Sequence, residues 1–379
     1  MRRIGVGLVG YGFMGKIHTY AYKSLPMLYE PAPAVPRLIG VADPSDQARQ
    51  LAVIQGGYEF AVADYRELLG RDDIEIINCC APNNAHRDVI VDAIRAGKHV
   101  YVDKPLACSL EQAREIVRVE AEAEADGLNR TRQMANQYRF IPALMRAKEL
   151  VRDGRLGRPY TFAARYLHNS NVDPNRPLHW KSSRAVCGGG VLVDLGAHVI
   201  DIVRFLLGDF KRVCASPVTA IPERPDGKGG TVRVDTDDVT LAIAEMENGA
   251  VGTIEASKLA TGANDELSID IRGSDGAITF NLMDPNWLKF YDNRRPDAPL
   301  GGDRGFVHIE AVQRFPKPAA VPSPKFSIGW MRFHIHSTHE FVRRVVSGEP
   351  GDPSLTDGLA VHRVIETCYN SPGVWADVV

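Results

Sequence analysis

The sequence lacks three features that would place the protein in a special class: a long hydrophobic run, an excess of charge of one sign, and a Cys-x-x-Cys pair. Because a membrane-spanning helix needs about 20 predominantly apolar residues, we expect no helix long and apolar enough to cross a membrane. The formal net charge of −2 gives no basic surplus for nucleic acid. The six cysteines lack the spacing of a zinc or redox motif, so we expect reduced thiols and no bound metal.

Two arginines, Arg2 and Arg3, precede an apolar run at the start of the chain, a pattern that can begin a signal peptide. The run from Ile4 to Val9 is too short for that purpose, and glycines and Lys16 interrupt the region that follows. We therefore expect a cytoplasmic protein. With 379 residues, of which 44% are hydrophobic, the chain is long enough for two domains with separate cores.

The first third of the chain alternates strand-like and helix-like segments, which predicts a parallel sheet with helices on both faces. We assign residues 1–128 to such a domain, a doubly wound Rossmann fold. The expected strands are residues 4–9, 37–42, 74–80 and 99–102, and the expected helices are residues 16–25, 46–55, 88–96 and 110–125.

The pattern changes in the second part, residues 129–379, where strands follow one another without helices between them. Residues 239–247 and 250–259 flank Asn248-Gly249, a dipeptide typical of a tight β-hairpin turn. The next strand alternates apolar and polar residues from Leu267 to Arg272, as a sheet with one exposed face requires. These features predict an α+β domain with a large, open-faced, mainly antiparallel sheet.

Gly10, Gly12 and Gly15 form a Gly-x-Gly-x-x-Gly motif between the first expected strand and the first expected helix. In a dinucleotide-binding fold the three glycines allow a tight turn, close approach of the pyrophosphate, and close packing of helix on strand. The helix N-terminus then offers N–H groups to the phosphates. We therefore expect this turn, including Phe13 and Met14, to bind a dinucleotide.

Asp43 ends the second expected strand, where a carboxylate can accept hydrogen bonds from the ribose hydroxyls of the cofactor. It would also repel a 2′-phosphate, which favours NAD over NADP. Arg49 lies close enough in the sequence to leave NADP possible. The alternative interpretation is that Asp43 only caps the turn formed with Pro44 and Ser45.

Several motifs resemble those of the Gfo/Idh/MocA oxidoreductases, a family that includes glucose-fructose oxidoreductase and inositol dehydrogenase. The resemblance rests on Ala81-Pro82-Asn83-Asn84-Ala85-His86, residues 96–100, Asp103-Lys104-Pro105, and the segment from Gly188 to Asp201. The segment around Asp173-Pro174 and His179-Trp180-Lys181 is similar to members that act on cyclic polyols and anhydrosugars. The chain departs from the family at Asp103, where glutamate is usual, at Gln137, where asparagine is usual, and at Lys181, where arginine is usual.

The resemblance implies catalytic roles for Lys104, Asp194 and His198. An ammonium at a strand end can stabilise charge that develops on a reacting hydroxyl oxygen. A histidine titrates near neutral pH and can accept the hydroxyl proton. Asp194 lies four residues before His198, so on a helix both face one side. Without the resemblance, a helix N-cap at Asp194 and a half-buried His198 would be equally good interpretations.

The resemblance also implies further contacts. Cofactor contacts are expected from Pro82, Asn83, His86, Asp103, Lys104 and Gln137. Substrate contacts are expected from Lys104, Asp194 and His198. His168, Asn169 and Trp180 are further candidates, since hydrogen-bonding groups and stacked aromatic rings hold sugars, although each could equally be a packing residue. The trio His334, His336 and His339 has no carboxylate or cysteine at a familiar interval, so we interpret it as the surface of a helix or strand.

Together these features predict an NAD(P)-dependent dehydrogenase that oxidises a hydroxyl of a sugar, cyclic polyol or anhydrosugar. The alternatives are an NADPH-dependent reductase of a keto-sugar, a glycosidase that retains NAD, and a non-catalytic dinucleotide-binding sensor. The open sheet face needs a cover, and the family provides one by pairing subunits, so we expect a homodimer or homotetramer. We expect no nucleic-acid or membrane partner.

Overall fold

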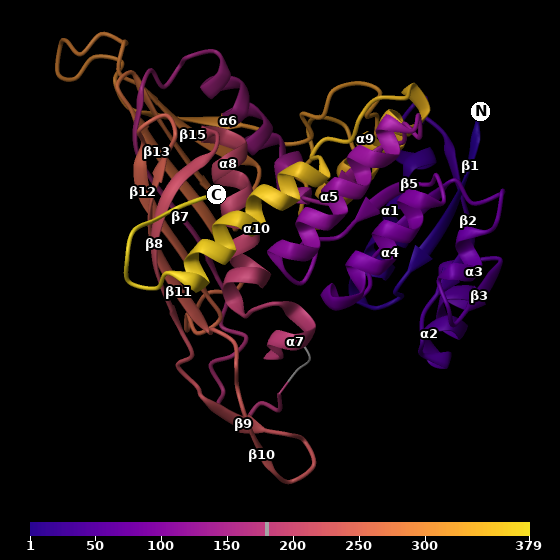
Figure 1. Cartoon of the computed structure of the whole chain (residues 1–379). Coiled ribbons are helices and arrows are strands. Elements are labelled where there is room, and N and C mark those ends of the chain that lie inside the picture. The colour runs from indigo at the N-terminus through magenta and orange to yellow at the C-terminus, as the bar shows by residue number, and fades with distance from the viewer. Residues whose placement is uncertain (179–181) are drawn as a thin grey trace. The chain divides into compact units, whose positions relative to one another are not determined.

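The computed structural model describes residues 1–178 and 182–379, which form two compact units (Figure 1). The first unit contains Met1–Phe140, Phe315–Ser323 and Gly329–Leu359. The second contains Ile141–Arg314, Pro324–Ile328 and Ala360–Val379. This division differs from the contiguous boundary predicted at residue 128. Residues 132–134 add a strand to the first sheet, and a helix late in the chain returns to cover that sheet. The first unit therefore contains segments that lie after residue 128 in the sequence.

A six-stranded parallel sheet organises the first unit, in the order β3-β2-β1-β4-β5-β6. Its strands are β1 (Arg3–Val9), β2 (Val35–Ala42), β3 (Phe60–Val62), β4 (Ile76–Cys79), β5 (His99–Val102) and β6 (Arg132–Met134). Its helical segments are α1 (Phe13–Leu28), α2 (Asp46–Leu51), η1 (Ala52–Gly56), α3 (Arg66–Leu69), α4 (Asn83–Arg95), α5 (Leu110–Ala125), η2 (Gln137–Phe140) and α9 (Trp330–Ser347). The predicted Rossmann fold is confirmed.

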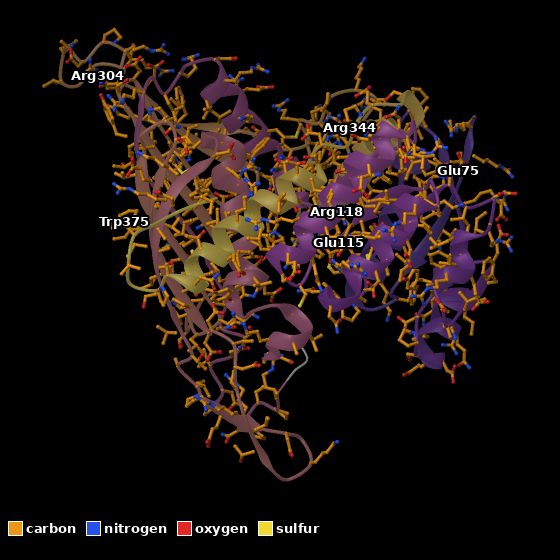
Figure 2. All side chains as sticks on the ribbon, viewed as in Figure 1. Glu75, Glu115, Arg118, Arg304, Arg344 and Trp375 are labelled. Atoms are coloured by element: carbon orange, nitrogen blue, oxygen red, sulfur yellow. The ribbon has the colours of Figure 1, made fainter. Side chains whose placement is uncertain are left out.

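The central strands are buried along nearly their whole length because both faces of the sheet are covered. One core joins the sheet to α4 and α5, and the other joins it to α1 and α9. Helix α5 shows how the pattern arises: Ala113 and Ile116 are buried, while Glu115 and Arg118 lie on its outer side (Figure 2). A parallel strand that is buried on both faces reads as a continuous apolar run, which is why these strands are recognisable in the sequence.

The sheet order reverses at β1, which has β2 on one side and β4 on the other. In open α/β sheets the ligand binds outside the carboxyl ends of the strands at this point. The turns after β1, β2, β4 and β5 all leave from that edge. These turns carry the residues predicted to hold the cofactor.

A nine-stranded mixed sheet organises the second unit, in the order β16-β15-β14-β13-β7-β12-β11-β8-β17. All its neighbouring strands are antiparallel except β12 and β7, so the predicted mainly antiparallel sheet is confirmed. Its strands are β7 (Pro159–Leu167), β8 (Phe210–Val218), β11 (Val239–Met246), β12 (Val251–Ser257), β13 (Glu266–Gly273), β14 (Gly276–Asn281), β15 (Trp287–Asp292), β16 (Phe306–Glu310) and β17 (Ala376–Asp377). A separate two-stranded ribbon is formed by β9 (Glu223–Pro225) and β10 (Thr231–Arg233).

Helices cover one face of this sheet, and the other face is exposed within the unit. The helical segments are α6 (Pro142–Arg152), α7 (Arg184–Cys187), η4 (Leu192–Gly196), α8 (Ala197–Leu207) and α10 (Leu355–Asn370), which begins in the first unit. On β11, Ala242 and Ala244 are buried, whereas Leu241 and Ile243 are about half exposed. This alternation follows from the pleat of a strand that is covered on one side.

One helical stretch among the described residues, Arg184–Leu207, is long and apolar enough to cross a membrane. The expectation that none would be is therefore wrong. The charged residues Asp194 and Asp201 interrupt the run in the sequence, yet its average hydropathy remains high. Most of its apolar window, 83%, is buried inside the structure, as in the core helix of a soluble protein.

Helix α9 can be tested as part of the first unit's core. Phe341 is fully buried, and its ring lies 4.7 Å from that of Tyr101 on β5. We expect Phe341→Ala to lower the free energy of unfolding by about 3–5 kcal/mol, because it opens a cavity in a closely packed core. Val346→Ala, at a partly exposed position on the same helix, is the control and should cost less than about 1 kcal/mol. Equal losses in denaturant unfolding would contradict the assignment of α9.

Candidate functional site

The glycine-rich turn after β1 has the close contacts that its motif predicts. Gly10 has a φ of +90°, and a Cβ there would lie 2.6 Å from the carbonyl oxygen of Cys80. A Cβ on Gly15 would lie 2.1 Å from the carbonyl oxygen of Gly10, so only glycine lets α1 approach β1 so closely. A Cβ on Gly12, by contrast, would meet nothing within 4 Å.

The N-terminus of α1 therefore opens onto free space on the side of Gly12. Gly12 is the N-cap residue, and the first turn contains no acidic side chain. The uncapped N–H groups of this turn form a site suited to phosphate. Phe13 is 70% exposed, and its ring stacks near that of Trp330 from α9. This arrangement fits the pyrophosphate of a dinucleotide.

Asp43 lies directly beside this turn. Its carboxylate accepts hydrogen bonds of 2.8 Å from the backbone N–H of Tyr11 and from that of Ser45. The second bond matches the turn-capping interpretation, and the first ties the end of β2 to the glycine-rich turn. Arg49 donates to the carbonyl oxygen of Asp43. Asp43 is thus held where the cofactor's ribose is expected, and its contact with ribose stays a prediction.

The turn after β4 carries Pro82, Asn83 and His86. Pro82 is the N-cap residue of α4, and Asn83 begins that helix. His86 is buried, with Nδ1 2.9 Å from the carbonyl oxygen of Pro105 and Nε2 2.8 Å from that of Ala81. Burial lowers the pKa of His86. These contacts show that His86 joins the turns after β4 and β5, so its cofactor contact stays a prediction.

Lys104 follows β5 and is half-buried beside the well-anchored residues of the same turn. Asp103 accepts a 2.9 Å hydrogen bond from the backbone N–H of Lys104, and its own N–H donates to the carbonyl oxygen of Cys79. Gln137 begins η2 and is buried. These three residues thus belong to the first unit, at or just beyond its strand ends; Asp103 and Lys104 were predicted there, whereas Gln137 was assigned to the second domain.

Asp194 and His198 belong to the second unit, on η4 and on the first turn of α8. Asp194 forms an ion pair with Lys258, with Oδ2 and Nζ separated by 3.0 Å. The ring of His198 lies 5.8 Å from that of Tyr166 on β7, and His198 is buried. Because η4 is a wide π-type turn, it is the sort of irregularity that recurs at functional sites.

A buried carboxylate holds the turn that leads into η4. Asp237 accepts hydrogen bonds from the backbone N–H groups of Gly190 and Leu192 and from the hydroxyls of Thr240 and Tyr369. A Cβ on Gly190 would lie 2.1 Å from the carbonyl oxygen of Asp237, so this turn requires glycine. The glycine run that begins this family motif therefore packs against Asp237.

A cavity of about 300 Å³ opens within the second unit. Most of the side chains around it can donate or accept hydrogen bonds. Its lining consists of His168, Ser170, Asn171, Arg176, Pro177, Ser182, Asp194, Arg224 and Lys258. Of the predicted substrate residues, His168 and Asp194 line it, Asn169 is exposed on the adjoining turn, and Trp180 lies outside the described residues.

Sequence reasoning missed most of this lining. Lys258 directly follows β12, and Asn171 lies just beyond β7, so the parallel pairing of those two strands brings both to one edge. Arg224 lies on β9 and donates to the carbonyl oxygens of Asn171 and Asp173. The one signal of this site in the sequence was the acidic pair Asp237-Asp238, directly before an apolar strand. Such a pair also occurs in ordinary turns, so it did not point to a cavity.

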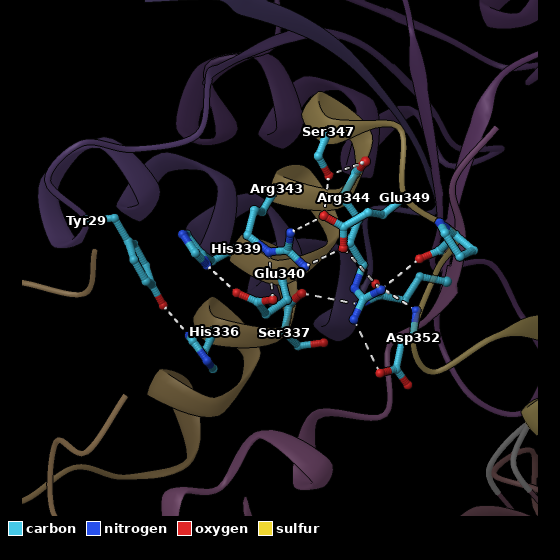
Figure 3. A network of polar contacts seen from close by, with 12 residues as sticks. Tyr29, His336, Ser337, His339, Glu340, Arg343, Arg344, Ser347, Glu349 and Asp352 are labelled. Carbon is cyan, nitrogen blue, oxygen red and sulfur yellow. Dashed lines mark hydrogen bonds and ion pairs between the residues drawn. The ribbon is translucent and has the colours of Figure 1, made fainter. Parts of the chain in front are cut away.

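The histidine trio was wrongly interpreted as a surface. His334, His336 and His339 lie on α9 and are buried, because that face of the helix packs into the core. His336, His339 and Glu340 place potential metal-ligand atoms within 4.8 Å of one another. The hydroxyl of Tyr29, however, contacts His336, and Glu340 contacts both His339 and Arg343 (Figure 3). We interpret the cluster as a hydrogen-bonded network, since a cation would have to displace these bonds.

Comparisons with known proteins agree with this geometry. Residues 4–126 match the oxidoreductase family with an NAD-binding Rossmann fold, and residues 144–279 match the Gfo/Idh/MocA C-terminal domain. The sequence is 33% identical to levoglucosan dehydrogenase of Pseudarthrobacter phenanthrenivorans, over 100% of this chain and 99% of that protein. It is 25% identical to inositol 2-dehydrogenase of Rhizobium meliloti, over 96% of each chain.

Solved structures agree as well. Levoglucosan dehydrogenase in complex with NADH and levoglucosan has a TM-score of 0.92 at 32% identity, with all of both chains covered. An oxidoreductase domain protein from Kribbella flavida has a TM-score of 0.94 at 32% identity, again over both whole chains. All four segments on which the resemblance rested lie within the matched domains, and the chain belongs to the Gfo/Idh/MocA family of oxidoreductases.

Proposed function

We propose that this oxidoreductase oxidises a hydroxyl of a sugar, cyclic polyol or anhydrosugar, with NAD as the hydride acceptor. The observation that carries the proposal is the cavity of the second unit, whose lining combines hydroxyl, amide and charged groups. Such groups suit a compact ligand with many hydroxyls. Its relatives, named as dehydrogenases of levoglucosan and inositol, support the same substrate class.

The first unit fits the cofactor through its own residues. The glycine-rich turn and the N-terminus of α1 would hold the pyrophosphate, and Asp43 would accept from the ribose hydroxyls. Pro82, Asn83, His86, Asp103, Lys104 and Gln137 lie at or just beyond the strand ends where the remaining contacts are expected. When bound, NAD supplies the carbon that accepts the hydride.

Three residues divide the remaining chemistry. The hydroxyl proton passes to an imidazole nitrogen of His198, which must be neutral to accept it. The Lys104 ammonium donates a hydrogen bond to the reacting oxygen and stabilises the negative charge that develops there. Asp194 orients the substrate by accepting a hydrogen bond from a hydroxyl, and His168, Asn169 and Trp180 are the further substrate contacts we propose.

A substrate screen tests the function. Purified protein is incubated with NAD or NADP and with levoglucosan, myo-inositol or D-glucose, and formation of the reduced cofactor is followed by absorbance. We expect NAD reduction with at least one of the three. An aryl glycoside assayed in parallel distinguishes a glycosidase that retains its cofactor. Absence of reduction with every substrate, together with release of the aryl group, would replace the proposal by that alternative.

The role of Asp43 predicts a change in cofactor preference. In the wild type, the carboxylate favours the free ribose hydroxyls of NAD and repels a 2′-phosphate. Asp43→Ala should therefore weaken NAD binding by about tenfold or more, as expected for loss of a charged hydrogen bond, and weaken NADP binding less. Asp46→Ala, which removes an exposed carboxylate on the next turn, is the control. A wild type that prefers NADP more than tenfold would contradict the role.

The role of His198 predicts the pH dependence of alcohol oxidation. Because only the neutral imidazole accepts the proton, kcat should rise with pH and level off above the histidine's pKa. His198→Asn should remove most of the turnover and flatten the acidic limb, while NAD binding persists. If Lys104 alone accepted the proton, His198→Asn would raise KM and keep the same limb. Measuring kcat against pH for both proteins separates the two mechanisms.

The exposed sheet face supports a proposal about assembly. Leu241 and Ile243 on β11 and Val251 on β12 are each about half exposed on it. Exposed apolar side chains gathered on one sheet face are typical of an interface, and we propose that a second copy of the chain covers them in a homodimer or homotetramer. Light scattering at micromolar concentration should show the oligomer, and a strict monomer would refute it.

We also propose a cytoplasmic location. Among the described residues the six cysteines form no disulfide, and three of them are buried, as is usual in a reducing compartment. Cell fractionation should recover the protein with cytoplasmic markers. Recovery in the secreted or membrane fraction would contradict this location.

A further inference from the structure

The cavity of the second unit contains an ion pair of which the proposed mechanism uses one member, Asp194, and leaves the other, Lys258, without a role. The Lys258 ammonium lies 3.0 Å from Oδ2 of Asp194, and both residues line the cavity. Lys258 is only 8% exposed, which is rare for a lysine. Its charge is therefore presented to the cavity rather than to bulk solvent.

The backbone holds Lys258 on both sides. Its N–H donates to the carbonyl oxygen of Asp238, at 3.0 Å, and its carbonyl oxygen accepts from the N–H of Asn171, at 2.9 Å. The side chain of Asn171 donates in turn to the carboxylate of Asp238. Lys258 thus has little freedom to leave the cavity, and its ammonium is pre-positioned for a ligand.

The partner carboxylate is held as firmly. The N–H of Asp194 donates to the carbonyl oxygen of Gly190, at 3.0 Å, and the N–H of Gly190 donates to Asp237. The desolvation free energy of two charges usually exceeds the stabilisation that their mutual attraction provides. A pair held in this way at a cavity wall, rather than packed in the core, indicates a role in binding.

We propose that Lys258 is a substrate-binding residue that, with Asp194, binds two neighbouring hydroxyl groups of the substrate. An ammonium has three N–H donors, and the ion pair with Asp194 uses one of them. A second donates to one substrate hydroxyl oxygen, while the adjacent hydroxyl donates to the carboxylate. Neighbouring hydroxyl oxygens on a ring lie about as far apart as Nζ and Oδ2 when they are gauche, and farther apart when both are axial, as in levoglucosan. Hydrogen bonds of ordinary length from Nζ and to Oδ2 can span either arrangement, so one diol can bridge the pair.

This inference rests on the proposed function and makes it narrower. It restricts the substrate to compounds with a hydroxyl beside a second hydroxyl, such as anhydrosugars and cyclitols. The competing interpretation is a structural ion pair that only stabilises η4. The structural interpretation predicts a loss of stability without a change in the selectivity for hydroxyl groups.

Levoglucosan, which has three contiguous hydroxyls, and its three monodeoxy derivatives distinguish the two interpretations. Their dissociation constants are measured by calorimetry on the NADH-saturated protein, so the test does not depend on turnover. For the wild type, we expect removal of a bound hydroxyl to weaken binding about 10- to 100-fold, as for hydrogen bonds to charged groups. Lys258→Met, which keeps the aliphatic stem, should bind levoglucosan weakly. The loss of affinity on removing the hydroxyl that Lys258 binds should fall to less than about threefold, while the losses for the other hydroxyls persist.

Two further variants complete the test. Lys211→Met removes an exposed ion pair with Glu245 on the same sheet and should keep the wild-type selectivity. Lys258→Arg retains the positive charge and should recover part of the selectivity if Lys258→Met folds poorly in a thermal melt. Wild-type selectivity in Lys258→Met would overturn the inference. A wild type that does not bind levoglucosan would also overturn it, while the proposed function would still be decided by NAD reduction in the substrate screen.

Discussion

The buried carboxylate of Asp237 is the constraint on which the candidate substrate site depends. A carboxylate removed from water must be satisfied by donors, and Asp237 has four: two backbone N–H groups and two hydroxyls. Burial raises the pKa of Tyr369, and the nearby Asp237 raises it further, so the phenol stays protonated and donates. Through these bonds, one side chain fixes the turn that begins η4 to β11 and to the end of α10.

Asp238, its neighbour, extends the same arrangement to Asn171 and Lys258, which also line the cavity. Its carboxylate accepts from the side chain of Asn171 and from the N–H of Ile221, and its carbonyl oxygen accepts from the N–H of Lys258. Two consecutive residues therefore position both members of the Asp194–Lys258 pair. Successive side chains of an extended chain point in opposite directions, so these two aspartates, directly before β11, can hold two different segments.

In the first unit the corresponding constraint is close backbone approach. The glycines of the turn after β1 let α1 pack against the strand, and this leaves the N–H groups of its first turn available for phosphate. The turns after β4 and β5 are tied together by His86, whose two ring nitrogens face two backbone carbonyls. His86 contacts the carbonyl oxygen of Pro105, the residue after Lys104. This contact anchors the turn and limits how far the Lys104 ammonium can move.

The sequence by itself determined those features of the fold and the site that depend on local residue patterns and residue types. Four of the six parallel strands, the glycine-rich turn, the hairpin at Asn248-Gly249 and the family motifs around Lys104 and His198 were predicted, because each depends on residues adjacent in the chain. The short strands β3 and β6 were not predicted. Only the tertiary structure decided the return of α9 to the first sheet, the burial of His334, His336 and His339, and the meeting of Lys258 with Asp194. Each of these joins segments distant in sequence. The pairing of β7 with β12 and the packing of α9 against α1 arise from long-range contacts, which the periodicity of a sequence does not predict.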